Sequence, residues 1–531
     1  MLPASPSPAP LPRLWRRGLL VVSLVALLLR FVNLEGKIFW QDESAVAMYE
    51  AGYTIGELES LFGDAHELRP QDLRRLTLLT PARGFGQTLR SLADDNPQIA
   101  PLYPVLARAW RLVVGDAVGP LRALSALLGV LAVVSLAYLA VELTRDPRVA
   151  WLAAALAAVS PFHQLYAQEA REYSLWAALT CLSSALLLRA LRLRRVTDWG
   201  LYTLSLIAGL YTHLFFGLVL LAHAVYVVGV GGFKRSASGR PGRDSVGFVA
   251  ASAVGLLSFA PWLVVVAQHW GRLRQQTDWT AGPTSRLDLA PQWLIDVCHL
   301  FVDQPNQVGG SEVSPFRLVA GLLLAALLVY ALAWAVQATP RRVWLFVVGL
   351  PLAPWLTLAL VDLARGGVLS KVERYLTPAY LGLELALALC AAHGLGGPRR
   401  SARFWAVLIG LLLVWGLLGD MRLTQVRFVR SKGDNEPLMA AARVVNPQPH
   451  PLLMVNMWRT APYTFLVMGR LFDDDTQLRL IYDQSQRLLP EQTPAGGLYI
   501  LNPSPVIRER LATAGEPVLN LDFADLLQVR P

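Results

Sequence analysis

The chain has 531 residues, of which 54% are hydrophobic and only 16% are charged, and its mean hydropathy is +0.42. Soluble domains carry roughly 25% charged residues, so this composition excludes an ordinary soluble protein. The net charge is +10, but most basic residues lie in short loops between apolar runs, the positive-inside pattern of membrane proteins. The composition predicts a polytopic α-helical membrane protein with membrane lipid, and no nucleic acid, as a partner.

The apolar runs are long enough to cross a bilayer, which takes about 20 residues. The first run, Gly18 to Leu34, follows three arginines as in a signal peptide. No small-residue cleavage site follows it, so a retained helix is expected. In total the runs predict about 11 transmembrane helices. They include 121–143, 149–166, a hairpin over 199–230, 246–267 and 404–418.

The charges in the loops predict the orientation. Basic clusters recur in every second loop, and basic loops stay in the cytoplasm. The clusters are Arg13/Arg16/Arg17, Arg145/Arg148, Arg189 to Arg195, Lys234/Arg235/Arg240/Arg243, Arg341/Arg342 and Arg399/Arg400. The expected protein is therefore a multi-pass protein of the plasma (inner) membrane with a cytoplasmic N-terminus.

Residues 1–430 are predicted to form the transmembrane domain and residues 431–531 a small extracytoplasmic α/β domain. The first outer loop covers about 35–120 and the second about 268–315. Segments 42–62 and 97–114 are expected to be amphipathic helices on the membrane surface. In the C-terminal region, strand-like runs such as Leu452 to Asn456 alternate with helix-like runs, which predicts the α/β domain. Its expected role is a cap or an acceptor-binding lid.

Unusual polar residues converge on the predicted outer face, and ionisable residues at membrane depth are functional candidates. Nucleotide sugars are absent there, so a glycosyl donor has to be lipid-linked. Inverting transfer needs a carboxylate base, here Asp42, and cations for the departing phosphate, for which arginine is well suited. The candidates are Asp42 and Glu43 as catalytic residues, and Glu169, Arg171, Tyr173, His213, Lys371 and Arg374 for substrate and lipid phosphate.

Each candidate also has a structural alternative. Asp42 could be only a helix N-cap, and Glu169 with Arg171 could form a structural ion pair. Lys371 and Arg374 could anchor lipid headgroups, and His213 could be a packed interfacial residue. The three cysteines are far apart, and His299 beside Cys298 is an isolated pair without an assigned role. No metal site or cofactor is predicted from these spacings, although a divalent metal stays open.

Five short motifs, taken in chain order, resemble those of the GT-C glycosyltransferases. The nearest branch is the bacterial one similar to dolichyl-phosphate-mannose–protein mannosyltransferases and lipid A aminoarabinose transferases. The matching segments are Trp40-Gln41-Asp42-Glu43, Asn96-Pro97 through Pro101-Leu102-Tyr103, Ser160-Pro161-Phe162 through Gln168-Glu169-Ala170-Arg171-Glu172-Tyr173, Tyr211-Thr212-His213, and Glu373-Arg374-Tyr375-Leu376-Thr377-Pro378.

The resemblance implies an inverting single displacement with a polyprenyl-phosphate sugar donor. It implies Asp42 as the base, Glu43 as a residue that binds the acceptor or orients the site, and Arg374 facing the lipid phosphate. Glu169 and Arg171 would contribute from the end of the third span. Many relatives carry histidine or lysine where this chain has Asn96 before its proline, so no metal contact is assigned there.

The leading hypothesis is a glycosyltransferase acting on the outer face, with a protein, lipid or glycan acceptor. The alternative is a transporter or flippase of a lipid-linked substrate, which would place acids in mid-span and often show two related halves. Here the polar residues lie at span ends, and no halves are found. A third hypothesis is a membrane scaffold or sensor in which the outer α/β domain does the binding.

Overall fold

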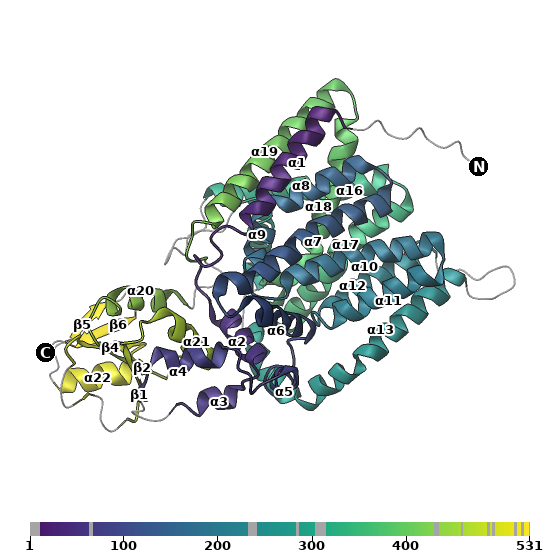
Figure 1. Cartoon of the computed structure of the whole chain (residues 1–531). Helices are drawn as coiled ribbons and strands as arrows, with labels where there is room; N and C mark the ends of the chain where they lie inside the picture. Colours follow the sequence, from purple (N-terminus) through teal and green to yellow (C-terminus); the bar gives the residue numbers. More distant parts are fainter. Residues whose placement is uncertain are drawn as a thin grey trace.

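The computed structural model describes residues 11–62, 67–231, 242–282, 286–302, 315–429, 435–457, 460–485, 489–490, 494–514, 518–521 and 525–529. It is a bundle of long helices with a small sheet at one end (Figure 1). Lys234, Arg235 and Arg240 of one predicted cytoplasmic loop lie outside the described residues, and so does the predicted domain boundary at 430/431.

The long apolar runs all form helices, because a backbone in lipid has to satisfy its own hydrogen bonds. These helices are α1 (Arg13–Leu29), α7 (Val118–Thr144), α8 (Pro147–Ala158), α9 (Pro161–Ala167), α10 (Tyr173–Leu193), α11 (Val196–Leu210), α12 (Phe216–Gly229), α13 (Arg243–Gln268), α16 (Pro315–Ala338), α17 (Arg341–Arg365), α18 (Thr377–Leu395) and α19 (Arg399–Leu423). The chain is therefore a multi-pass membrane protein.

Seven of the described helices are long and apolar enough to cross a membrane, and the bent pair α8 and α9 raises the number to eight. This pair replaces one predicted straight span. It bends by 62° at Pro161, where the missing N–H interrupts the helix. The predicted spans α1, α11 and α12 have only 17, 15 and 14 residues. The predicted count of about 11 is therefore not confirmed.

Shorter helices cover the end of the bundle where the sheet lies. They are α2 (Gln41–Ala51), α3 (Ile55–Glu59), α4 (Pro70–Arg74), η1 (Arg75–Thr77), α5 (Phe85–Asp95), α6 (Leu102–Val114), α14 (Trp270–Thr277), η2 (Asp278–Ala281), η3 (Arg286–Asp288), α15 (Leu289–Cys298), η4 (Leu369–Lys371) and η5 (Glu373–Leu376). Most of them come from the two segments predicted as outer loops.

The two expected surface helices have different outcomes. Segment 42–62 is not one amphipathic helix, because Gly52 (φ +83°) ends α2 in the left-handed conformation, and α3 follows. Helix α2 is buried from Glu43 to Ala51, so it belongs to the core. Helix α6 has 13 residues, too few for a span, and it exposes apolar side chains such as Leu112 while it buries Arg108. An outward apolar face is typical of an interfacial helix.

A six-stranded sheet is formed by β1 (Glu67–Leu68), β2 (Leu452–Asn456), β3 (Gln477–Ile481), β4 (Leu498–Leu501), β5 (Val518–Leu521) and β6 (Leu526–Val529), in the order β1-β3-β2-β4-β6-β5. Strand β2 is parallel to β3 and β4, and the other pairs are antiparallel. With it pack α20 (Glu436–Val445), α21 (Pro462–Leu471) and α22 (Pro505–Thr513). Edge strand β1 comes from the first predicted outer loop, and α21 packs against α2 and α4.

A buried ion pair fixes the segment that enters α2. Arg122 of α7 binds both carboxylate oxygens of Glu43, at 2.8 and 2.6 Å. Its remaining N–H groups donate to the backbone oxygens of Leu34, Lys37 and Ile38, at 2.7, 3.0 and 2.8 Å. All five guanidinium donors are therefore used, as a buried arginine requires. Helix α7 thus holds the connection between α1 and α2.

We predict that Arg122→Gln strongly destabilises the protein, because it leaves the buried Glu43 carboxylate without its cation. Losing one partner of a buried pair costs about 3–5 kcal/mol. Thermal unfolding of the purified protein in detergent measures the effect. Arg194→Gln is the control, since Arg194 pairs with Asp244 at an exposed site, and it should unfold close to wild type. Equal unfolding temperatures for both variants would contradict the prediction.

Candidate active site

Asp42 lies in the first turn of α2 and is not the helix cap. The N-cap position belongs to Trp40, which makes no side-chain capping bond. The side chain of Asp42 is 26% exposed, whereas that of Glu43 is fully buried. Consecutive residues of a helix point in different directions, so only the first of the two acids is open to a substrate.

Two arginines from distant parts of the chain approach the same oxygen of Asp42. Arg171 Nη1 lies 3.2 Å from Asp42 Oδ2, and Arg374 Nη2 lies 3.8 Å from it. Arg171 belongs to the turn between α9 and α10, and Arg374 belongs to η5. Among the described residues these two are the ion-pair partners of Asp42. Three segments therefore meet at one carboxylate.

The two arginines differ in how their donors are used. Arg171 binds the carboxylate of Glu172 through Nε at 2.9 Å and Nη2 at 3.0 Å, and Nη2 also lies 3.4 Å from the Tyr173 hydroxyl. Burial opposes ionisation of Glu172, but the Arg171 guanidinium outweighs it and holds the pKa of Glu172 below its ordinary value. Arg171 is thus largely neutralised within its own turn.

Arg374 is largely buried and has no carboxylate that binds it through two hydrogen bonds. Its side chain is 14% exposed, it donates no hydrogen bond to any described residue, and its Nε is buried. Three aromatic rings surround the guanidinium, with centroids 5.8 Å (Trp40), 5.9 Å (Trp279) and 5.5 Å (Tyr375) from its carbon. Cation–π contacts stabilise the charge but leave the N–H groups open. Arg374 therefore has donors available for an anion.

His213 lies near this cluster in the turn between α11 and α12. Its ring stacks on Trp176 at 4.0 Å and lies 6.2 Å from the ring of Tyr173. Burial lowers the pKa of His213 to about 4, and the nearby Glu172 only partly offsets this. At neutral pH the imidazole is therefore uncharged, and its chemistry here is hydrogen bonding and stacking.

The other candidates from the sequence lie around the cluster rather than on Asp42. Glu43 is engaged with Arg122, and it also accepts a hydrogen bond from the Ala170 N–H at 2.8 Å. Glu169 is fully buried, and its backbone oxygen accepts from the Arg171 N–H. Lys371 is half-buried in η4 and is not among the ion-pair partners of Asp42.

Two important residues were absent from the predicted site, although the sequence contains a signal for each. Glu172 directly follows Arg171, and a helix start after an acidic residue is a common arrangement. Arg122 lies inside a predicted span, where a charge is expensive and has to be paired. Its partner, however, is 79 residues away in the sequence.

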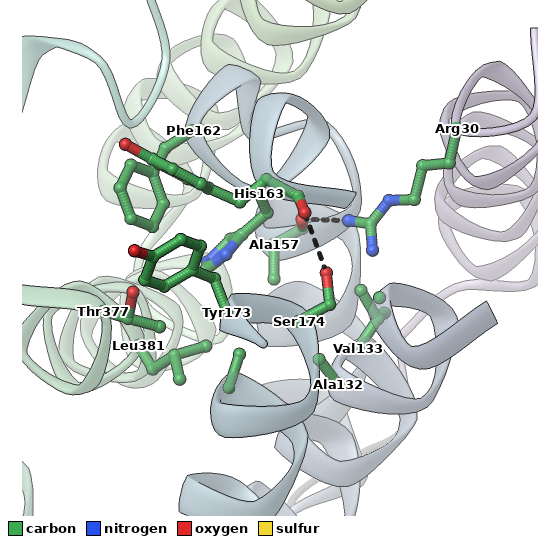
Figure 2. Close-up of a pocket in the computed structure, with 13 residues that line it drawn as sticks. Arg30, Ala132, Val133, Ala157, Phe162, His163, Tyr173, Ser174, Thr377 and Leu381 are labelled. Atoms are coloured by element: carbon green, nitrogen blue, oxygen red, sulfur yellow. Dashed lines mark hydrogen bonds between the residues drawn. The ribbon is translucent and has the colours of Figure 1, made fainter. Parts of the chain in front are cut away.

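A small cavity lies between α7, α9, α10 and α18. Figure 2 shows Tyr173, His163 and Phe162 on one side of it and Arg30 on the other, with Arg30 donating to the Ala157 oxygen. Its volume is about 10 Å³, roughly the room of one water molecule. It is therefore too small for a sugar.

Among the described residues, one group of side chains has the composition of a metal site. Asp296, His299 and Glu373 are all buried, and they offer ligand atoms within 4.8 Å of one another. The sequence alone assigns no role to His299. In the structure it lies beside Glu373, the residue before Arg374.

The fold and part of the sequence match known proteins. A family model of dolichyl-phosphate-mannose-protein mannosyltransferases matches residues 95–265, about a third of the chain. The structure is similar to ArnT from Cupriavidus metallidurans bound to undecaprenyl phosphate, with a TM-score of 0.55, 15% identity, and 97% of this chain and 98% of that chain covered. The apo state of the same protein has a TM-score of 0.53 and 14% identity, with 97% of this chain and 97% of that chain covered.

The Archaeoglobus fulgidus oligosaccharyltransferase in the apo form aligns with a TM-score of 0.48 and 13% identity, over 89% of this chain and 65% of that one. No curated protein matches the sequence. The family match covers the segment from Asp95 through α12 to α13, and the ArnT fold covers nearly the whole chain. Together they show that the chain has the fold of ArnT over nearly its whole length and resembles the dolichyl-phosphate-mannose-protein mannosyltransferase family over a third of it.

Proposed function

We propose that this protein is a glycosyltransferase of the GT-C type that transfers a sugar from a polyprenyl-phosphate-linked donor to an acceptor hydroxyl, with inversion, on the outer face of the plasma membrane. The observation that carries the proposal is the pairing of Asp42 with Arg374. A partly exposed carboxylate lies 3.8 Å from a largely buried guanidinium that donates no hydrogen bond to a described residue. A proton acceptor and an anion-binding group in contact are the two parts that the reaction needs.

In the proposed reaction the carboxylate of Asp42 accepts the proton of the acceptor hydroxyl. The hydroxyl oxygen forms a bond to the anomeric carbon of the sugar, and the bond from this carbon to the phosphate oxygen breaks. The electron pair leaves with the polyprenyl phosphate, whose charge Arg374 stabilises through its fork of N–H groups. Inversion follows from this single displacement. The acceptor is a protein, lipid or glycan hydroxyl.

The remaining candidates take supporting roles in this proposal. Arg171 orients Asp42, since one of its Nη groups is 3.2 Å from Asp42 while its other donors hold Glu172. Neutral His213 and Tyr173 offer a ring face and a hydroxyl to the sugar. Glu43 is a positioning residue for α2. Glu169 and Lys371 shape the surroundings of the donor.

The lipid-linked donor and the side of the membrane have separate support. The similar ArnT structure is bound to undecaprenyl phosphate, which makes this lipid the first donor carrier to test. The arginine-rich loops favour a cytoplasmic N-terminus. In Figure 1, α1 begins at the end of the molecule remote from the sheet, and α2 lies at the other end. The site and the sheet would then both be outside.

We predict that Asp42→Asn abolishes transfer while the protein still folds, because the amide cannot accept the proton. Loss of a general base lowers kcat by about 10²–10⁴-fold. Release of undecaprenyl phosphate from a panel of undecaprenyl-phosphate sugars measures turnover without knowledge of the sugar. Asp278→Asn, an exposed acid in η2, should stay active. A fully active Asp42→Asn enzyme would overturn the proposed role.

For Arg374 we predict a loss of phosphate binding. Hydrogen bonds to a charged group are worth about 1.5–3 kcal/mol, so Arg374→Gln should weaken binding of undecaprenyl phosphate about 10–100-fold. Arg374→Lys keeps the charge but loses the fork, so it should fall in between. The dissociation constant of undecaprenyl phosphate is the measurement. Exposed Arg365 at the end of α17 supplies the control, Arg365→Gln. Unchanged affinity in Arg374→Gln would refute the assignment.

The predicted orientation has its own test. Alkaline phosphatase fused after Pro531 should be active if the sheet lies outside, because that enzyme matures only in an oxidising compartment. A fluorescent protein that folds only in the cytoplasm is the reciprocal fusion and should be dark. The opposite pair of results would place the site in the cytoplasm, where a nucleotide sugar is the expected donor.

A further inference from the structure

A second cluster of ionisable side chains lies beside the proposed active site and takes no part in the proposed reaction. Asp296 belongs to the last turn of α15, His299 directly follows this helix, and Glu373 begins η5. All three are more than nine-tenths buried, with 2%, 8% and 7% exposure. His299 Nδ1 lies 2.8 Å from Glu373 Oε2. Segments about 75 residues apart thus meet here.

Some atoms of the cluster that could coordinate a metal make no hydrogen bond within the described structure. Asp296 Oδ1 accepts from Gln292 Nε2 at 2.6 Å, but Asp296 Oδ2 has no partner among the described residues. The second ring nitrogen of His299, Nε2, is likewise buried without one. Glu373 Oε1 accepts from the Tyr166 hydroxyl at 3.1 Å. Such outer hydrogen bonds orient carboxylates that bind a metal, and a bound ion is one of the few partners that satisfy orphaned buried atoms.

The charges of the cluster also favour a cation. Two carboxylates and one imidazole share a buried space, and desolvated carboxylates repel each other. Arg374 directly follows Glu373 in the sequence, but its guanidinium pairs with Asp42 and not with the cluster. Lys371 acts on Asp296 only at a distance, without a hydrogen bond or ion pair between them in the described structure. A bound cation would neutralise both carboxylates at once.

We propose that Asp296, His299 and Glu373 bind a divalent first-row transition-metal ion of the kind of Zn²⁺ or Mn²⁺. One imidazole nitrogen and two carboxylate oxygens are typical ligands of these ions, whereas Ca²⁺ and Mg²⁺ prefer oxygen alone. Ligand atoms of a tetrahedral zinc ion lie about 3.4 Å apart, given bonds of about 2.1 Å. The ligand atoms of Asp296, His299 and Glu373 now lie within 4.8 Å of one another. Small side-chain rotations would bring them to the distance of about 3.4 Å that a zinc ion needs.

The ion would join α15 to η5 and so act on the neighbouring residue. Glu373 immediately precedes Arg374, and η4 just before it is held by Asp362, whose carboxylate accepts from the N–H groups of Leu369 and Ser370 at 3.0 and 2.6 Å. With both ends of this turn fixed, the position of Arg374 near Asp42 is determined. The metal site rests on the cluster alone. Only its effect on Arg374 rests on the proposed function.

The test begins with the metal content of the full-length protein in detergent. The protein is stripped with EDTA, reloaded with Zn²⁺ or Mn²⁺, freed of excess ion and analysed by mass spectrometry for bound metal. Asp296→Asn and His299→Gln should each retain one equivalent fewer than wild type. Asp278→Asn and His450→Gln change exposed residues of the same types and should retain the wild-type amount. Elution on size exclusion confirms that each variant is folded.

Loading with Co²⁺ reads the site directly in the wild-type protein. A visible ligand-field spectrum that is absent in His299→Gln but present in His450→Gln supports the site. Wild-type protein that takes up no metal, or variants that retain as much as wild type, would overturn it. For the effect on Arg374, chelation should weaken binding of undecaprenyl phosphate several-fold in wild type but not in Arg374→Gln. Equal losses in both proteins would reject that effect and leave the metal site standing.

Discussion

The place of Asp42 depends on the buried ion pair between Arg122 and Glu43. Arg122 uses all five of its donors on Glu43 and on the backbone between α1 and α2. Glu43 in turn accepts from the N–H of Ala170, the residue before Arg171. One ion pair therefore positions both the proposed base and the turn that carries its nearest cation. Because the pair is fully buried, it costs much to break and tolerates little displacement.

The charges around Asp42 are arranged so that one cation remains open. Arg171 is paired with Glu172, whereas Arg374 is surrounded by aromatic rings that supply no carboxylate. A guanidinium in such a setting keeps its donors for an incoming anion. The same region contains the proposed metal ligands Asp296, His299 and Glu373, of which Glu373 directly precedes Arg374. The proposed metal site and the proposed donor site are thus joined through the consecutive residues Glu373 and Arg374.

The sheet and the first predicted outer loop form one packed unit. Strand β1 from this loop extends the sheet, and α21 packs on α2 and α4. The hydroxyls of Tyr49 and Tyr463 are 2.6 Å apart, which joins the helix of Asp42 to α21. The sheet is therefore tied to the helix that carries Asp42. This coupling suits the cap or lid role expected from the sequence, and residues 431–531 as a separate domain remain a prediction.

The sequence by itself determined the membrane class, the helical runs and the polar motifs, because apolar length and the position of charges are local properties. It placed α7 and α13 within a few residues and singled out Asp42, Arg171 and Arg374. Only the tertiary structure separated Asp42 from its neighbour Glu43, broke the third span and brought Arg122 and Asp296 to their partners. Those outcomes depend on contacts between residues far apart in the chain. The bend of a helix, the burial of a side chain and the partner of a charge depend on which distant segments pack together in the folded protein.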